Sequence, residues 1–387
     1  MITLKKNADR RVRRGHLWVF SNEIADPPVA ELEPGSIHEL HDAAGEFLAM
    51  VYANAASLIT ARIMSRKRVQ IDGIFLEQRI GAALERRQRL FPERDYYRLI
   101  FGEADLLPGL IVDRYGPVLA VQSLTAGMDV LLDTVLEVLV KAVAPDGIYL
   151  RNDSPSRALE GLTQDRRLAY GSVSETVTIA SAGLKFIVDV VNGQKTGFFL
   201  DQEANRSLMK QYVFPEAKVL DLFCYTGAWG LHAAAAGAAQ VTGVDSSRSA
   251  VNLAESNATL NGLADRFHGV RENALEFLKK SHETWDVVIL DPPAFIKSRS
   301  QVKEGQKGYI DINRRALTKI NPGGILVTCS CSHHLDAQNF EETLAIAARQ
   351  SGKELWILDT RGQGPDHPVL LSMTETRYLK VIVAQIV

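Results

Sequence analysis

The stretch that decides the fold reads Lys218-Val-Leu-Asp-Leu-Phe-Cys-Tyr-Thr-Gly-Ala-Trp-Gly230 and continues in an alanine-rich run to Gly237. Residues 219–223 are short and mostly apolar, like a buried parallel strand, and residues 228–236 favour a helix by propensity. Between them, Thr226-Gly227 predicts a tight turn whose glycine lets another molecule approach the backbone. A strand, a tight turn and a helix in this order are typical of the nucleotide crevice of doubly wound α/β proteins.

The residues of the turn indicate which nucleotide would bind there. A dinucleotide fingerprint needs glycine at three positions, but Tyr225 occupies the first, and Gly227 and Gly230 follow. A bulky first residue suits a ligand without a pyrophosphate, such as S-adenosylmethionine (SAM). The next strand, residues 241–245, ends in Asp245, which is placed to bind ribose hydroxyls. The alternative is an ordinary strand-turn-helix unit without a ligand, because glycine motifs are weak by themselves.

The composition allows more than one packed domain and excludes a basic surface over the whole molecule. A chain of 387 residues with 46% hydrophobic residues is long enough for two or three domains. Because the net charge is −2, nucleic acid binding would depend on local patches. Three cysteines without a Cys-x-x-Cys pair fit a reducing, cytoplasmic location. No stretch is long and apolar enough to span a bilayer, so we expect no membrane association.

The chain divides into three expected domains. Residues 1–70 carry closely spaced turn signals with strand-like runs between them, such as 47–52 and 57–63, and predict a β-rich module. Residues 71–190 begin with an amphipathic helix and then alternate strands and helices, which predicts a central α+β domain. Residues 191–387 predict a doubly wound, Rossmann-like domain.

Regular alternation of strands and helices supports the fold of the third domain. The last two strands have no helix between them, so we expect them to pair antiparallel. The expected strands are 218–223, 240–245, 266–270, 286–290, 323–328, 354–359 and 377–386, and the expected helices are 228–236, 248–260, 274–281, 306–320 and 337–350.

The polar candidates of this domain all follow the carboxyl ends of its strands. Ligands of doubly wound sheets bind at that edge, whereas random placement would scatter polar residues over both edges. The amide of Asn273, after the third strand, is a candidate to meet the adenine edge. The predicted cofactor site comprises Phe199, Asp221, Phe223, Tyr225, Thr226, Gly227, Asp245, Ser246, Asn273, Ala274 and Asp291.

The fourth strand runs into Asp291-Pro-Pro-Ala-Phe295, which indicates a site for a flat base. Two prolines hold the turn rigid by fixing φ. A base can lie against such a turn while Asp291 hydrogen-bonds to its polar edge. The alternative is that the two prolines only terminate the strand.

The fifth strand runs into Thr328-Cys-Ser-Cys-Ser-His-His334. A cysteine in a strand is usually a small apolar core residue, and this reading competes with a reactive thiol. If the strand stops near Thr328, Cys331 lies on the loop and reaches the cleft, so we favour Cys331 over Cys329 as the nucleophile. The histidines could equally tune a thiol or be plain loop residues. Their spacing matches no set of metal ligands, so we expect no metal.

A thiol matters at this edge because C5 of a pyrimidine is a poor nucleophile. A thiolate that adds to C6 creates an enamine, whose C5 can attack the methyl group of SAM. Asp291 would then hold N3 and the amine of the base and favour charge on the ring. Methylation of an exocyclic nitrogen would need the Asp-Pro-Pro corner but no cysteine.

Two further segments are candidates for ligand contact. Residues 193–202, Gly-Gln-Lys-Thr-Gly-Phe-Phe-Leu-Asp-Gln, look like a ligand-facing loop, and Asp201 is placed to cap a helix that runs to Tyr212. Near the start, arginines cluster beside two aromatic residues and could contact phosphates, although a solvated basic edge explains them too. The RNA-binding candidates are Arg10, Arg11, Arg13, Arg14 and Lys195.

Four motifs together resemble the class I SAM-dependent RNA methyltransferases that carry a PUA domain: residues 221–227, residues 291–295, Ser330-Cys-Ser332 and residues 193–202. A group within this family methylates C5 of cytosine in 23S ribosomal RNA. The likeness covers nearly the whole chain and implies a PUA module in the first 70 residues. It also implies SAM as cofactor, ribosomal RNA as partner, a homodimer, and Cys331 as nucleophile. Asn273 departs from the family, which usually has an aspartate there.

Three hypotheses follow. The leading one is a SAM-dependent cytosine-C5 methyltransferase acting on 23S ribosomal RNA through a cysteine–base intermediate. The second is an N-methyltransferase that uses the Asp291-Pro-Pro corner on a nucleobase or a protein amide. The third is a non-catalytic RNA-binding protein that keeps SAM as a structural ligand.

Overall fold

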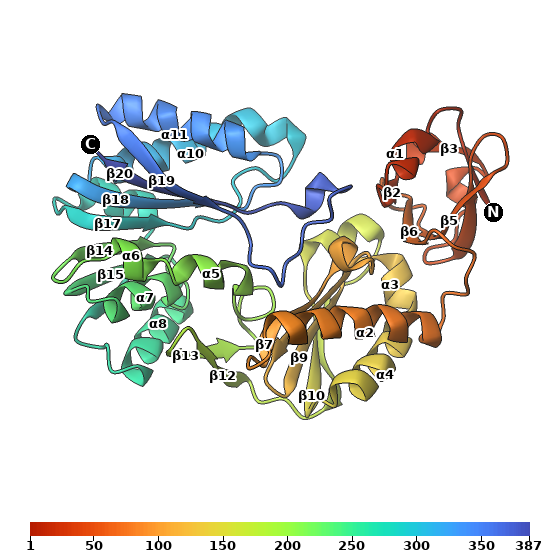
Figure 1. Cartoon of the computed structure of the whole chain (residues 1–387), viewed down its shortest axis with the longest axis horizontal. Coiled ribbons are helices and arrows are strands. Elements are labelled where there is room, and N and C mark those ends of the chain that lie inside the picture. The colour runs from red at the N-terminus through yellow and green to blue at the C-terminus, as the bar shows by residue number, and fades with distance from the viewer. The chain divides into compact units, whose positions relative to one another are not determined.

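The structure is a computed structural model that describes residues 1–387, and the chain forms two compact units (Figure 1). The first unit consists of Met1–Val177, Val188–Leu200 and Pro365–Thr376. The second consists of Thr178–Ile187, Asp201–Gly364 and Arg377–Val387. The division into three domains with boundaries near residues 70 and 190 stays a prediction.

The first unit opens with a six-stranded sheet in the order β2-β6-β5-β4-β1-β3. Strand β6 begins at Ala61, so the expected start at Ser57 is wrong; the intervening residues form a turn in which the Thr60 hydroxyl donates to the Ser57 carbonyl at 2.9 Å. The elements are β1 (Ile2–Leu4), α1 (Asp9–Arg13), β2 (Trp18–Val19), β3 (Ile24–Asp26), β4 (Ile37–His41), β5 (Phe47–Ala53) and β6 (Ala61–Ser65).

A second sheet of the first unit has five strands in the order β11-β10-β9-β8-β7. The predicted helix at 73–90 is confirmed as α2, which Asp72 caps by accepting from the Phe75 amide at 3.0 Å. The elements are α2 (Gly73–Leu90), β7 (Tyr96–Phe101), β8 (Leu110–Tyr115), β9 (Val118–Ser123), α3 (Ala126–Val130), α4 (Leu132–Val143), β10 (Gly147–Asn152) and β11 (Asp165–Gly171).

The segment before the second unit's main sheet departs from expectation in one respect. Strands β12 (Thr176–Ser181) and β13 (Leu184–Asp189) pair as the predicted hairpin. The single helix expected from Asp201 to Tyr212 is wrong, because the chain forms two short helices, α5 (Glu203–Arg206) and α6 (Met209–Tyr212). Asp201 lies in a preceding 3₁₀ turn, where its carboxylate accepts from the Tyr378 hydroxyl at 2.5 Å instead of capping a helix.

The second unit contains a seven-stranded sheet in the order β16-β15-β14-β17-β18-β20-β19, and every predicted element of this region is present. Strands β14 to β18 run parallel, and the last two strands pair antiparallel, as predicted. The elements are β14 (Lys218–Leu222), α7 (Ala228–Ala235), β15 (Gln240–Asp245), α8 (Arg248–Leu260), β16 (Phe267–Arg271), α9 (Ala274–Lys280), β17 (Trp285–Leu290), α10 (Val302–Leu317), β18 (Ile320–Ser330), α11 (Ala337–Ser351), β19 (Leu355–Arg361) and β20 (Lys380–Ile386).

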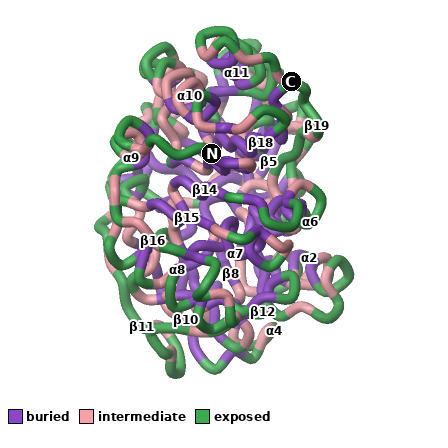
Figure 2. Tube along the Cα trace, turned by 90° about the vertical axis from the view of Figure 1, so that its left-hand side faces the viewer, coloured by how far each residue is buried: buried purple, intermediate pink, exposed green.

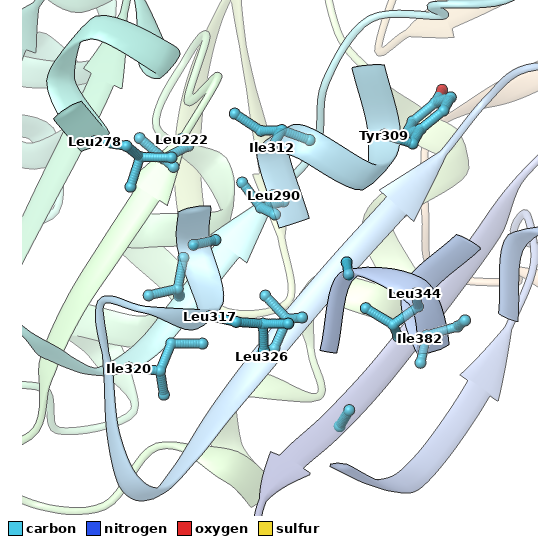
Figure 3. Packing of buried hydrophobic residues seen from close by; sticks show 14 of the residues in the cluster. Leu222, Leu278, Leu290, Tyr309, Ile312, Leu317, Ile320, Leu326, Leu344 and Ile382 are labelled. Atoms are coloured by element: carbon cyan, nitrogen blue, oxygen red, sulfur yellow. The ribbon is translucent and has the colours of Figure 1, made fainter. Parts of the chain in front are cut away.

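The core of the second unit fills the space between this sheet and the helices α9, α10 and α11 (Figure 3). Leu222, Leu290 and Leu326 of three neighbouring strands are 0% exposed and pack against Ile312 and Leu344 of α10 and α11. Helices α7 and α8 pack against β14 and β15 and cover the other face (Figure 1). The central strands are therefore buried on both faces (Figure 2), which explains their continuous apolar sequences.

None of the helices is both long and apolar enough to cross a membrane.

The close packing of β15 against β16 yields a first prediction. A Cβ atom at Gly243 would lie 2.4 Å from Cζ of Phe267, so Gly243→Ala should destabilise the protein by about 1–3 kcal/mol through overpacking. The matched control is Gly81→Ala in α2, where the added methyl group meets open space and should stabilise by about 0.5–1 kcal/mol. Urea unfolding followed by circular dichroism measures both, and equal stability of the two variants would contradict the packing argument.

Candidate functional site

The sheet order places a topological switch point between β14 and β17. From β14 the chain proceeds to β15 and β16 on one side, and then continues from β17 on the other. Ligands of doubly wound sheets bind outside the carboxyl ends of the strands at this point. The carboxyl ends of β14 and β17 lead into the bend at 223–227 and into Asp291, respectively.

The bend after β14 has an unusual backbone. Phe223, Tyr225 and Gly227 have φ values of +64°, +47° and +74°. Two non-glycine residues in the left-handed region are uncommon and indicate a conformation that the surroundings impose. A Cβ atom at Gly227 would lie 2.9 Å from Cβ of Ala254, so the glycine makes room for α8. Packing against α8 thus requires a glycine at this position, and the expected approach of a ligand to its backbone stays a prediction.

Asp221 is buried beneath this bend. Its Oδ2 accepts from the Gly230 amide at 2.8 Å, and its Oδ1 has no hydrogen-bond partner. Burial raises the pKa of this carboxyl to about 7, against the hydrogen bond from Gly230, which lowers it. An uncompensated acceptor of this kind is costly unless a ligand satisfies it.

Asp245 connects the second strand to the bend. One carboxylate oxygen accepts from the Tyr225 amide at 3.1 Å and the other from the Ser247 amide at 2.9 Å. Ser246, between these residues, is exposed. The amide of Asn257 in α8 donates to the Thr226 carbonyl at 3.0 Å and holds the bend from the other side.

Asn273 caps the helix that follows the third strand. Its Oδ1 accepts from the amides of Leu275 and Glu276 at 3.0 and 3.3 Å, so the oxygen expected to meet adenine already has two donors. Ala274, the first residue of α9, is buried. The capping role explains the side chain without a ligand, and the adenine contact stays a prediction.

Three residues that the sequence did not single out surround Asp291. The side-chain amide of Gln202 donates to both carboxylate oxygens of Asp291, at 3.2 and 3.1 Å, and the Trp229 indole N–H donates to one of them at 3.0 Å. Burial raises the pKa of Asp291, while the bond from Trp229 and the charge of Arg206 lower it. Gln202 and Trp229 lie within the motifs that suggested the site, but no sequence signal marked Arg206.

Arg206 is the buried counter-charge of this region. It is 3% exposed, and burial lowers its pKa. The carboxylates of Asp291, Asp201, Glu203 and Asp221 act in the opposite direction and favour its charged form. One guanidinium group thus offsets part of the negative charge beneath the site.

The cysteines differ in accessibility. Cys329 is 0% exposed at the end of β18, and burial raises its pKa well above the usual thiol range. Cys224 in the bend is also buried, and its pKa is raised for the same reason. Cys331 is partly exposed. It directly follows Ser330, the last residue of β18, and therefore lies at the start of the loop. Of the three thiols, Cys331 has the best access to a substrate.

Ser332 joins the cysteine loop to the Asp-Pro-Pro corner. Its hydroxyl accepts from the Ile296 amide at 3.2 Å and lies 3.0 Å from the Tyr309 hydroxyl. Tyr309 in turn packs against Phe295, with ring centroids 4.7 Å apart. Phe295 therefore lies against α10, and the two loops that carry Asp291 and Cys331 are held together.

Lys380 of β20 lies behind the same loop. It pairs with Ser330 in the sheet, and its ammonium group donates to the carbonyls of Ser332 and Tyr378 at 2.7 and 2.8 Å. Burial lowers its pKa to about 8, against the charge of the Cys331 thiolate, which favours the ammonium form. No pattern in the sequence marks this residue, because it lies in an apolar strand far along the chain.

The remaining candidates belong to the first unit. Lys195, with φ +51°, places its ammonium group 4.8 Å from the ring centroid of Phe199. Arg11 forms an ion pair with Glu23 at 2.8 Å.

The other arginines near the start differ in their partners. Arg13 forms ion pairs with Asp9, Asp42 and Glu46 at 2.6 to 3.0 Å. Arg10 bonds to Asn7, and Arg14 is exposed. Such carboxylate pairing leaves less charge free for phosphate, and RNA contact by these arginines stays a prediction. The structure contains no group of three or more His, Cys, Asp or Glu residues that could hold a metal ion.

Comparisons with known proteins agree with this geometry. A PUA-like domain family matches residues 2–66, and an S-adenosylmethionine-dependent methyltransferase family matches residues 163–369. These matches confirm the predicted fold: an N-terminal PUA-like module and a C-terminal Rossmann-like methyltransferase domain. The crystal structure of SMU.776 complexed with SAH has a TM-score of 0.87 over 100% of both chains at 22% identity, which supports the same fold.

Two curated relatives extend over the whole chain. The ribosomal RNA large subunit methyltransferase I of Shewanella denitrificans is 37% identical over 100% of this chain and 99% of its own. That of Cronobacter sakazakii is 35% identical over 98% of this chain and 97% of its own. The chain therefore belongs to the SAM-dependent methyltransferases and, among them, to the family of the ribosomal RNA large subunit methyltransferase I proteins.

Proposed function

We propose that this protein methylates C5 of cytosine in 23S ribosomal RNA through a covalent adduct between Cys331 and the base. The observation that carries the proposal is the junction at Ser332, which holds a partly exposed thiol beside a corner with a buried carboxyl group. The relatives named above act on ribosomal RNA, which supports the choice of substrate. The homodimer and the cytoplasmic location stay predictions.

The residues beneath the bend fit SAM. The Oδ1 of Asp221 has no hydrogen-bond partner, and the raised pKa of the carboxyl shows that the charge of Arg206 compensates its burial only in part. SAM carries an ammonium and a sulfonium group, and it supplies an electrophilic methyl group when bound. Asp221 would hold the positive end of the cofactor, and Asp245, at the next strand end, would hold the ribose.

Cys331 would act as the nucleophile. Its thiolate forms a bond to C6 of cytosine, and the electron pair of the C5–C6 double bond moves to C5. C5 would then take the methyl group that bound SAM supplies, and the electron pair of the broken carbon–sulfur bond would stay on sulfur. A base removes the proton from C5, the C5–C6 double bond forms again, and the thiolate leaves with the electrons of the carbon–sulfur bond.

Asp291 and Lys380 would support the addition step. A carboxyl group whose pKa is raised by burial can donate a proton to N3, while its other oxygen accepts from the exocyclic amine. This contact stabilises the charge that the ring gains when sulfur adds. The Lys380 ammonium, fixed by two carbonyls, provides the positive charge that favours the thiolate form of Cys331.

The role of Cys331 predicts a loss of chemistry without a loss of fold. Cys331→Ala should lower methyl transfer at least about 10³-fold, since the covalent route is removed, while SAM binding is unchanged. Mass spectrometry of nucleosides from 23S ribosomal RNA, isolated from cells lacking the protein and treated with each variant, measures the product. Cys329→Ala is the matched control and should retain most activity, because this thiol is 0% exposed.

A cytosine with fluorine at C5 distinguishes the hypotheses further. A base removes hydrogen from C5 as a proton but cannot remove fluorine in this way, so the enzyme cannot be released from the base. RNA that contains the fluorinated cytosine should therefore form a covalent adduct with the wild type and with Cys329→Ala, and this adduct should survive denaturing electrophoresis. The Cys331→Ala variant should form none. Methyl transfer that persists in Cys331→Ala, with the label on nitrogen, would establish the N-methyltransferase alternative. SAM binding without any transfer by the wild type would establish the non-catalytic one.

Asp221 predicts a pH dependence of cofactor binding. Its carboxyl, with a pKa of about 7, is mostly neutral at pH 6 and mostly ionised at pH 8, and only the ionised form attracts a cationic ligand. SAM should therefore bind about tenfold more tightly at pH 8 than at pH 6, as measured by calorimetry. Asp221→Asn keeps the acceptor for Gly230 and should bind SAM weakly at both values. The same pH dependence in both proteins would assign it to the ligand instead.

Lys380 predicts the reactivity of the Cys331 thiol. The ammonium is charged below a pKa of about 8, so it supports the thiolate at neutral pH and loses this effect as the pH rises. Lys380→Met should slow labelling of Cys331 by iodoacetamide at pH 7 about tenfold, whereas Lys380→Arg keeps the charge and should label normally.

The full pH profile separates charge from structure. Other groups near this loop, which are common to all variants, are Asp291, Tyr309, His333, Asp336 and Tyr378. At pH 10 the Lys380 ammonium, with a pKa of about 8, has lost its charge, so equal labelling of wild type and Lys380→Met there shows that the loop is intact. Equal labelling at pH 7 as well would contradict the role of Lys380.

A further inference from the structure

A cavity of about 440 Å³ in the first unit lies between strand β6 and helix α2. Leu17, Ile63 and Phe75 provide an apolar floor, and Arg66, Lys67 and Arg79 contribute three cationic side chains to its lining. The volume falls within the range of pockets that hold small organic molecules, about 300–1,000 Å³. Apolar and cationic groups are thus combined in one hollow, separate from the residues of the methyltransferase site.

No carboxylate lines this cavity. Arg66 donates to the carbonyls of Val12 and His16 at 2.9 and 3.2 Å, and Arg79 donates to the carbonyl of Met64 at 3.3 Å. Burial lowers the pKa of both guanidinium groups, and no neighbouring negative charge opposes it. The backbone carbonyls hold both arginines in place but leave their charge without a counter-charge.

Three buried or half-buried arginines of this unit differ from those of the cavity. Arg62, Arg87 and Arg98 each form an ion pair with a buried carboxylate, at 2.6 to 2.7 Å. The chain has 46 acidic and 44 basic residues, so a shortage of acidic residues does not explain why no carboxylate lines this cavity. Arg66 and Lys67 are exposed and Arg79 is half-buried, so their charges, which no carboxylate neutralises, remain available to an anionic ligand.

We propose that this cavity binds a nucleotide of single-stranded RNA, with the base against the apolar floor and the flanking phosphates on Arg66, Lys67 and Arg79. Arg79 lies 5.2 Å from the Phe75 ring centroid, so it presents a planar guanidinium above an aromatic residue, as surfaces that stack bases do. The occupant rests on the proposed function, since the substrate is RNA. The site would hold the RNA at a second point, through residues other than those that contact the methylated base.

The test compares two double variants with the same change in charge. Lys67→Gln/Arg79→Gln removes two cations from the cavity. Arg68→Gln/Arg89→Gln removes two cations from the same segments, but neither residue lines the cavity. Binding of an unstructured, fluorescently labelled RNA oligonucleotide is measured by anisotropy at several salt concentrations, with all substitutions made in the Cys331→Ala protein, so that no methyl transfer is required.

The cavity variant should bind this RNA at least about tenfold more weakly than the control variant. Each phosphate contact on a single strand contributes about 0.7 to the slope of log affinity against log salt, so the slope should fall by about 1.4. SAM affinity should be equal in both variants. In proteins that keep Cys331, the cavity variant should show a raised KM for RNA at nearly unchanged kcat.

Equal RNA affinity and equal salt slopes in the two double variants would overturn the proposal. A second result would also overturn it: cytidine monophosphate binds to the cavity of the wild type, and the RNA oligonucleotide does not displace it. The cavity would then be a site for free nucleotides. If the protein does not methylate C5, the cavity proposal can still be judged from this measurement, because RNA binding is measured in proteins that lack Cys331.

Discussion

The second unit depends on the burial of two carboxyl groups at the ends of adjacent parallel strands. Asp221 lies near the carboxyl end of β14 and Asp291 directly follows β17, and burial raises the pKa of both. Water would stabilise these groups in an unfolded chain, so the folded protein must replace it with amides, an indole N–H and the charge of Arg206. One oxygen of Asp221 remains without a partner, and this incomplete compensation leaves room for a cationic ligand.

The features that could be predicted from the sequence are those that short, contiguous stretches of residues determine. The central strands β14, β17 and β18 are largely buried on both faces, and each of their apolar runs can be recognised in the sequence because helices of ordinary length separate the strands. The switch point follows from their order, so the edge that carries Asp245 and Asp291 follows too. The prediction failed where tertiary contacts decide: Asp201 resembled a helix cap, but the Tyr378 hydroxyl, far along the chain, takes its carboxylate.

The same limit explains which residues of the site were missed. Gln202, Arg206 and Lys380 act through single contacts to residues that are distant in sequence, and no periodicity or spacing marks such contacts. Gly227 shows a residue that the turn pattern marks but whose packing role it does not reveal. Its φ of +74° fits the predicted turn, and its missing side chain also makes room for Ala254 of α8, a contact between segments that no local pattern predicts.

Charge without compensation is the feature common to the two sites. The whole chain is nearly neutral, and most buried charges are paired, as Arg62 and Arg87 are. Asp221 has an unpartnered oxygen in the interior, whereas the guanidinium groups of exposed Arg66 and half-buried Arg79 form no ion pair, so the two sites have opposite charges and suit opposite ligands. A sulfonium nucleoside suits the first and a phosphodiester the second. An enzyme that joins a cationic donor to a polyanionic substrate needs both, and a uniformly basic surface would repel the donor.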